Sequence, residues 1–137
     1  MDRVRKVDYC YLKVTNRSGQ GLKILAELEA AGVNLLAFSG FPAGGGGAQV
    51  DLVPENMKTL SQAARRAGWK LSKRKRGFLV SGDDRIGAAR RQLQKLATAR
   101  INVTAADAVA AGAGRYGMIL WVKPKDYARA ARLLKAR

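Results

Sequence analysis

The chain has 137 residues, 47% of them hydrophobic, which is enough for one compact domain or for two small repeats. It contains no histidine and one cysteine, so the usual zinc sites and histidine-based catalytic arrangements cannot be assembled. We therefore expect no enzyme, no metal and no cofactor. The formal net charge of +16 attracts polyanions, but it is spread evenly over the two halves and forms no basic tail.

The lone Cys10 lies inside an apolar run, which is typical of a buried thiol in a reducing compartment. The apolar runs are far shorter than the roughly 20 residues of a membrane-spanning helix. The opening sequence MDRVRK also lacks the apolar region of an export signal. These features predict a cytoplasmic protein.

The first half predicts the element order βαββαβ. Residues 7–15 alternate as a strand, and the next segment has apolar residues at helical spacing, with Ser18 as the cap and Gly32 at the end. A hairpin follows, with strands at 33–41 and 48–53 and a flexible turn at 42–47. Pro54 is predicted to begin a second helix that ends at Gly68, and residues 69–75 are predicted to form the fourth strand.

The pattern restarts at Gly77, which predicts a first repeat over 1–76 and a second over 77–137. The second repeat predicts a strand at 78–81, a helix capped by Asp83 or Asp84, extended segments at 101–109 and 116–122, and a last helix from Pro124. The chain then ends, so this copy reads βαββα without its last strand. We expect another strand to cover that edge, either from the other repeat or from a second molecule.

Together these elements predict an α+β fold: a ferredoxin-like βαββαβ unit repeated in tandem, with antiparallel sheets and helices on one face. The turn at 16–19 and the segment 31–35, AGVNL, resemble the ACT domain, a small-molecule-sensing module attached to many amino-acid metabolic enzymes. The resemblance covers almost the whole chain as a tandem pair.

The resemblance implies an amino-acid effector site where two such domains pack side by side. The family's proline is replaced by Ser18 and Ile86, and Arg100 stands where the first copy has Gly32, so the second site departs further from the family pattern. The matching positions are Asn16, Arg17, Ser18, Gly19, Asn34 and Leu35 in the first copy, and Asp84, Ile86, Gly87 and Asn102 in the second.

These residue types suit a free amino acid for a physical reason. The ligand is a zwitterion, and an asparagine amide supplies both a donor and an acceptor without adding charge. Backbone N–H groups at a helix start favour a carboxylate, and glycine permits a close approach. We expect Asn16 and Asn34 to lie near one end of the sheet and to hold one ligand. The alternative is a purely structural role, in which Gly19 and Gly87 only form turns and Ser18 and Asp84 only cap helices.

The preferred hypothesis is a non-catalytic regulatory or sensor protein that binds an amino acid at the interface between its repeats or between subunits. It would act as a homodimer or with a partner enzyme. The alternative is a nucleic-acid or polyanion binder that uses the basic run Lys70, Lys73, Arg74, Lys75 and Arg76. A third possibility is a structural partner that docks through the open sheet edge.

Overall fold

The computed structural model describes all residues, 1–137, as two compact units. The first unit comprises Asp8–Lys75, and the second comprises Met1–Val7 together with Arg76–Arg137. The elements in chain order are β1 (Arg3–Thr15), α1 (Gln20–Ala30), β2 (Leu35–Gly44), β3 (Gly47–Pro54), α2 (Met57–Ala67), β4 (Lys75–Asp83), α3 (Ala88–Thr98), β5 (Val103–Gly112), β6 (Arg115–Val122), the 3-10 turn η1 (Pro124–Asp126) and α4 (Tyr127–Leu134).

The sheet of the first unit has the strand order β2-β3-β1. Both strand pairs are antiparallel, with Leu12 opposite Val50 in the β1–β3 pair. Alternation along β1 buries Cys10 and Leu12 and leaves Tyr9 half-buried on the opposite face, as the sequence predicted. The buried residues of the core are Cys10, Leu12, Ile24, Leu28, Val33, Val50, Leu52, Leu60 and Ala63.

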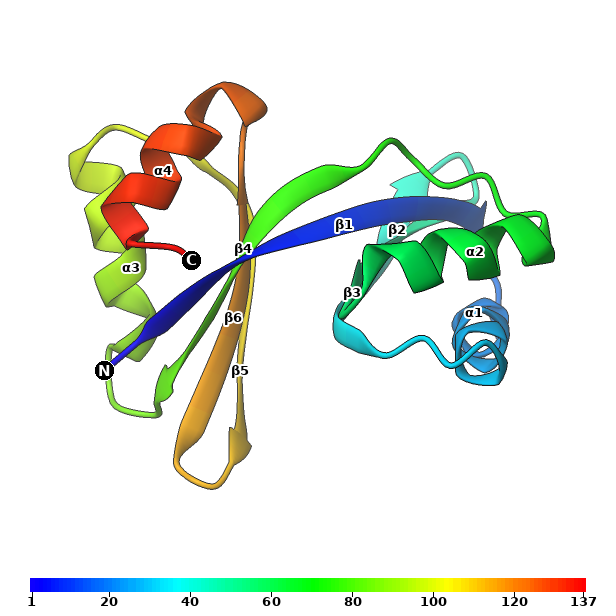
Figure 1. Cartoon of the computed structure of the whole chain (residues 1–137), viewed down its shortest axis with the longest axis horizontal. Helices are drawn as coiled ribbons and strands as arrows, with labels where there is room; N and C mark the ends of the chain where they lie inside the picture. The colour runs from blue at the N-terminus through cyan, green and yellow to red at the C-terminus, as the bar shows by residue number, and fades with distance from the viewer. The chain divides into compact units, whose positions relative to one another are not determined.

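The second unit repeats this arrangement with the strand order β1-β4-β6-β5. Figure 1 shows α3 and α4 together on one face of this sheet. The ring of Tyr127 stacks on Phe78 with ring centroids 4.7 Å apart, and the inward stripe of α4 is buried throughout. That stripe consists of Tyr127, Ala130, Ala131 and Leu134. The α+β fold with tandem ferredoxin-like units is therefore confirmed.

The missing last strand of the second repeat comes from the start of the chain. The first residues of β1 lie beside β4 within the second unit, and Val4 joins its core. The backbone of Arg137 bonds to this segment twice, donating to Val4 over 3.1 Å and accepting from Lys6 over 2.8 Å. The unit boundary therefore differs from the predicted repeats, because residues 1–7 pack with the second repeat and not with the first.

Residues 69–74, predicted as a strand, form none. This segment meets β1 at one point, where Ser72 donates its backbone N–H to the Tyr11 carbonyl oxygen and accepts from the Tyr11 N–H with its hydroxyl, both over 2.9 Å. The hydroxyl of Ser72 accepts where a backbone carbonyl would accept in a strand pair. Residues 69–71 therefore do not pair with β1 between Tyr11 and residue 15.

The predicted helix starts were also wrong. Gly19 and Gly87, both in the left-handed conformation, precede α1 and α3, and no side chain caps either helix. Pro54 ends β3, and Asn56 caps α2 by accepting from the N–H groups of Lys58 and Thr59. Ser18 lies one residue before the glycine that precedes α1, and Asp84 lies three residues before the glycine that precedes α3, so neither can cap its helix.

The inward stripes of α1 and α3 follow helical spacing only in part. Leu28 in α1 and Leu96 in α3 are buried, but Leu25 is 40% exposed. In α3 the inward position next to Leu96 is taken by Gln92, although helical periodicity favours an apolar residue there. No helix of the structure is long and apolar enough to span a membrane.

Candidate functional site

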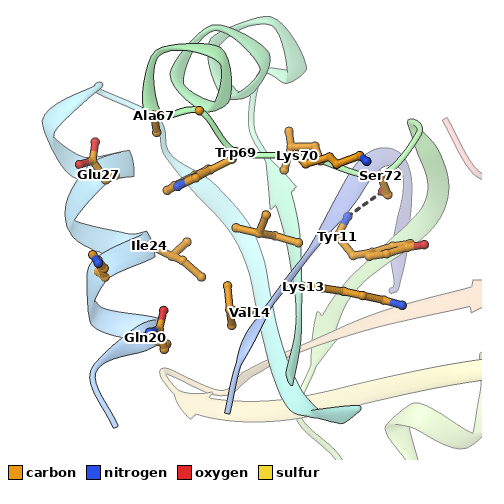
Figure 2. A pocket seen from close by; sticks show the side chains of 14 residues that line it. Tyr11, Lys13, Val14, Gln20, Ile24, Glu27, Ala67, Trp69, Lys70 and Ser72 are labelled. Carbon is orange, nitrogen blue, oxygen red and sulfur yellow. Dashed lines mark hydrogen bonds between the residues drawn. The ribbon is translucent and has the colours of Figure 1, made fainter. Parts of the chain in front are cut away.

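The first unit has a groove of about 710 Å³ between α1, β1 and residues 67–72. This volume is within the range of small-molecule sites. Figure 2 shows Val14, Ile24 and Trp69 directed into it, whereas Lys13 and Lys70 extend away from α1. The groove thus has an apolar floor next to one face of α1.

The groove exists because the predicted fourth strand is not formed. Residues 13–15 of β1 pair with β3 on one side, and beyond the contact between Ser72 and Tyr11 no strand covers their other edge. The chain approaches instead from the end of α2, where Trp69 donates its backbone N–H to Ala64 over 2.9 Å and packs against the core. An unpaired strand edge and an indole ring therefore face the same space.

Two opposite charges of α1 line this groove. Lys23 and Glu27 are one helical turn apart, both are exposed, and neither takes part in an ion pair. Gln20, the first residue of α1, adds an amide at one end. Because no side chain caps α1, backbone N–H groups of its first turn are available nearby.

The predicted turn Asn16–Gly19 directly precedes this groove. The backbone N–H of Asn16 donates to the Gly46 carbonyl oxygen over 2.8 Å, which ties the turn to the tip of the β2–β3 hairpin. Gly19 has φ 90°, and a Cβ there would meet no atom within 4 Å. Backbone conformation alone accounts for this glycine. Arg17 and Ser18 are exposed.

Asn34 lies at the other end of α1. Its side-chain amide donates to Glu55 over 3.1 Å, and with Leu35 it borders a separate hollow of about 420 Å³. The 11 residues of α1 span roughly 16 Å between Asn16 and Asn34. The expectation that both lie near one end of the sheet is therefore wrong within this unit, because the chain runs the length of the helix between them.

The predicted turn of the second unit repeats that of the first. Asp84 donates its backbone N–H to Gly114 over 2.9 Å, and Gly87 has φ 78°. Ile86 is fully exposed, and Asn102 is exposed just before β5. Arg100 adopts φ 58° where Gly32 adopts φ 71°, so the left-handed conformation is kept without its glycine. The structure does not gather these side chains around one point.

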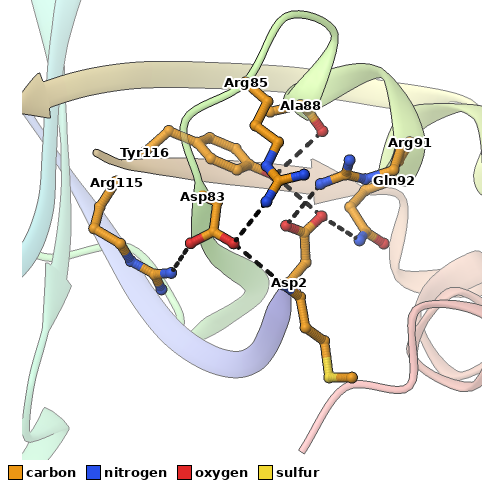
Figure 3. A network of polar contacts seen from close by, with 9 residues as sticks. Asp2, Asp83, Arg85, Ala88, Arg91, Gln92, Arg115 and Tyr116 are labelled. Atoms are coloured by element: carbon orange, nitrogen blue, oxygen red, sulfur yellow. Dashed lines mark hydrogen bonds and ion pairs between the residues drawn. The ribbon is translucent and has the colours of Figure 1, made fainter.

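The sequence did not predict a group of side chains that surrounds the carboxylate of Asp2 beside α3 (Figure 3). The Asp2 carboxylate accepts from Gln92 Nε2 over 2.8 Å, Tyr116 Oη over 3.2 Å and Arg91 Nη2 over 3.3 Å. Its side chain is only 5% exposed. Burial raises the pKa of Asp2, but the bonds from Gln92 and Tyr116 and the charge of Arg91 outweigh it and lower the pKa overall. The only sequence signal was glutamine in an apolar helical stripe.

A second, exposed carboxylate lies beside it. Asp83 accepts from Arg115 over 2.9 Å, is 4.0 Å from Arg85 and is 3.5 Å from the amino group of Met1. The hydrogen bond from Arg115 is the main reason that the pKa of Asp83 is lowered. Arg85, which lies inside the predicted turn, thus forms an ion pair with a side chain of its own unit.

The residues of the basic run are exposed, but three already have partners within their own units. Arg74 forms an ion pair with Asp8 over 2.7 Å, and Lys75 is 5.8 Å from the ring centroid of Tyr11. Arg76 lies 4.0 Å above the ring of Tyr127. Lys70 and Lys73 remain without such a contact.

The sequence matches no protein-family model and no curated protein. Solved structures do share the fold. A protein from Bacteroides thetaiotaomicron has a TM-score of 0.76 at 15% identity, covering 98% of this chain and 88% of its own. The regulatory subunit of aspartate kinase from Thermus thermophilus, in its ligand-free form, has a TM-score of 0.66 at 12% identity, covering 98% and 94%. The regulatory subunit of aspartate kinase from Thermus flavus has a TM-score of 0.57 at 15% identity, covering 98% of this chain and 94% of its own. These likenesses show that the chain shares its fold with regulatory subunits of aspartate kinase.

Proposed function

We propose that this chain is a non-catalytic regulatory protein that binds a free amino acid in the groove of the first unit. The fold that it shares with regulatory subunits of aspartate kinases supports this class of function. Fold alone does not assign a ligand, so the proposal rests on the side chains that line the groove.

The observation that carries the proposal is that two charged side chains without ion-pair partners lie beside an apolar surface in the same groove. Lys23 offers a cation for the carboxylate of an amino acid, and Glu27 offers an anion for its ammonium group. Ile24 and Trp69 provide a surface for the side chain of the ligand. This arrangement favours an amino acid with an apolar side chain over an acidic or basic one.

Regulation requires that the ligand prefer one of two arrangements of the protein. The turn 16–19 leads directly into α1, and its bond to Gly46 connects it to the hairpin tip. A ligand that orders the start of α1 would thus act on the turn and the hairpin together. The readout would be the activity of a partner enzyme or the association of two copies of the chain.

A melting-temperature screen tests the proposal. Each of the twenty amino acids is added at millimolar concentration, and a ligand that binds only the folded protein raises the midpoint. We expect apolar amino acids to produce the largest shifts. If no amino acid changes the midpoint, the proposed ligand class is wrong.

Matched lysine variants localise the effect. Lys23→Ala removes the cation in the groove, and Lys58→Ala removes an exposed lysine from α2, outside the groove. We expect the first variant to lose the ligand-induced shift and the second to keep it. Equal shifts in both variants would place the ligand elsewhere.

Polyanion binding is the second candidate, favoured by the net charge of +16 and by the unpartnered Lys70 and Lys73. It predicts affinity for RNA or DNA that falls steeply with salt. The double variant Lys70→Ala/Lys73→Ala should weaken binding and reduce that salt dependence. No retention of nucleic acid at low salt would dismiss this candidate.

A further inference from the structure

The space between the first strand and the first helix is lined by equivalent residues in the two units. Residues 68 apart correspond in the two copies, so Lys23 and Ile24 of α1 match Arg91 and Gln92 of α3. Val14 of β1 likewise matches Gly82 of β4. In the first unit these residues line the open groove. In the second unit they surround the side chain of Asp2.

The contacts of Asp2 are those of a bound carboxylate. Two neutral donors, Gln92 and Tyr116, and one cation, Arg91, share its oxygens, and the side chain is almost completely buried. Charge-assisted bonds of this kind are stronger than neutral ones. The carboxylate therefore sits in a built site, not on a solvated surface.

Gly82 shows that the site is shaped around this carboxylate. A Cβ at residue 82 would overlap Asp2 Oδ1 and would lie 3.0 Å from a ring carbon of Tyr116. The first unit carries a valine at the matching position, and its side chain lines empty space. Glycine at 82 thus provides the room that the Asp2 side chain occupies.

The site also holds an unused acceptor. Gln92 is 4% exposed, its Nε2 donates to Asp2, and its Oε1 accepts from no group in the protein. A buried acceptor without a partner is costly, and an apolar residue would fill this stripe more cheaply. Gln92 is therefore explained by the carboxylate that it binds and not by the core.

We propose that the second unit contains a carboxylate-binding site made by Arg91, Gln92 and Tyr116, which the chain fills with its own Asp2. The comparison with the open groove rests on the proposed function of the first unit. The occupied site itself does not, because it is defined by contacts within the second unit. The chain accordingly has one open position and one that its own Asp2 occupies.

Chemical rescue tests this proposal. Asp2→Ala empties the site and leaves its donors in place, so a small carboxylate should bind there. We expect the variant to melt about 5 °C below the parent protein. Sodium acetate should recover part of this loss relative to sodium chloride at equal ionic strength, and the parent protein should respond equally to both salts.

Two further variants give the test its specificity. Asp2→Ala/Arg91→Ala should lose the acetate effect, whereas Asp2→Ala/Arg90→Ala should keep it, because Arg90 bonds to Gln94 and not to Asp2. If acetate stabilises Asp2→Ala no more than it stabilises the parent protein, the site does not bind carboxylates and the proposal is overturned.

Asp2→Asn keeps the proposal testable if the alanine variant does not fold. It fills the same space but presents an amide to the donors, so its urea midpoint should fall without any response to acetate. A variant as stable as the parent protein would contradict a role for the charge. None of these measurements uses an amino acid, so a negative amino-acid screen would leave them informative.

Discussion

The backbone N–H of Asn16 donates to the carbonyl oxygen of Gly46, and sixty-eight residues later Asp84 makes the same bond to Gly114. In both units this bond joins the turn before the first helix to the tip of the hairpin. Both partners are backbone groups, so the bond does not depend on which side chains residues 16 and 84 carry. The repeated turn is thus anchored at one end by the hairpin and continues at the other into the first helix of its unit.

This bond predicts slow hydrogen exchange at two exposed positions. The amides of Asn16 and Asp84 should be protected, whereas that of Ser18, in the same solvent-exposed turn, should exchange rapidly. Amide exchange followed by NMR measures all three. Equal rates for Asn16 and Ser18 would show that the hairpin does not hold the turn.

Replacing residues in the left-handed conformation should stabilise the second unit. Arg100 has φ 58° and Lys135 has φ 54°, and the corresponding helix ends in the first unit are Gly32 and Gly68. A side chain in this region costs about 1 kcal/mol relative to glycine. We expect Arg100→Gly and Lys135→Gly each to raise the free energy of unfolding in urea by up to about 1 kcal/mol.

The reverse substitutions in the first unit serve as controls. Gly32→Ala and Gly68→Ala should destabilise the protein by a similar amount, since both glycines have positive φ. Stabilisation by these alanines, or destabilisation by the glycines in the second unit, would contradict the backbone explanation.

Gly82 and Asp2 should be energetically coupled. Gly82→Ala pushes its new methyl group into the Asp2 carboxylate, and we expect a loss of about 1–3 kcal/mol in the free energy of unfolding. In the Asp2→Ala background the methyl group has room, so the loss should be smaller by about 1 kcal/mol. A double-mutant cycle in urea measures the difference, and strictly additive effects would argue against the contact.

Tyr9 should reduce the alkaline stability of the fold. Burial, followed by the charge of Asp51 and the neighbouring Tyr11, raises the pKa of Tyr9 from 10.0 to about 12. The folded protein thus keeps this proton in a pH range where the unfolded chain releases it. The contribution to stability is complete below pH 10 and is lost as the pH rises toward about 12.

The matched variant for this effect is Tyr9→Phe, which cannot ionise. The stability difference between parent protein and variant should be constant below pH 10 and should change in favour of the variant between pH 10 and about 12. Urea unfolding at several pH values measures it. A difference that does not depend on pH would show that Tyr9 ionises normally.

The sequence was sufficient for most of the fold because alternation and helical spacing report burial directly. The stripe of α4 and the end of α2 at Gly68 follow from such local rules. The role of residues 3–7 does not, since it depends on which strand lies beside β4. Strand neighbours far apart in sequence leave no periodic signal.

The candidate site was only partly predictable for a related reason. The turn at Asn16 was recognised from its residues, and it does precede the groove. The groove itself arises from a strand that fails to form after Ser72, and the Asp2 site joins residues about ninety positions apart. Neither event has a local signature in the sequence.

The most direct test of the central claim uses the two tryptophans of the chain, one in each unit. Trp69 lines the groove of the first unit, and Trp121 lies on β6 of the second. Each indole N–H gives its own signal in a proton–nitrogen correlation spectrum, and Trp69→Phe assigns the two. On titration with the amino acid that gives the largest melting shift, we predict that the Trp69 signal moves in a saturable way while the Trp121 signal stays in place. A ligand that moves only the Trp121 signal, or neither, would contradict the groove as the binding site.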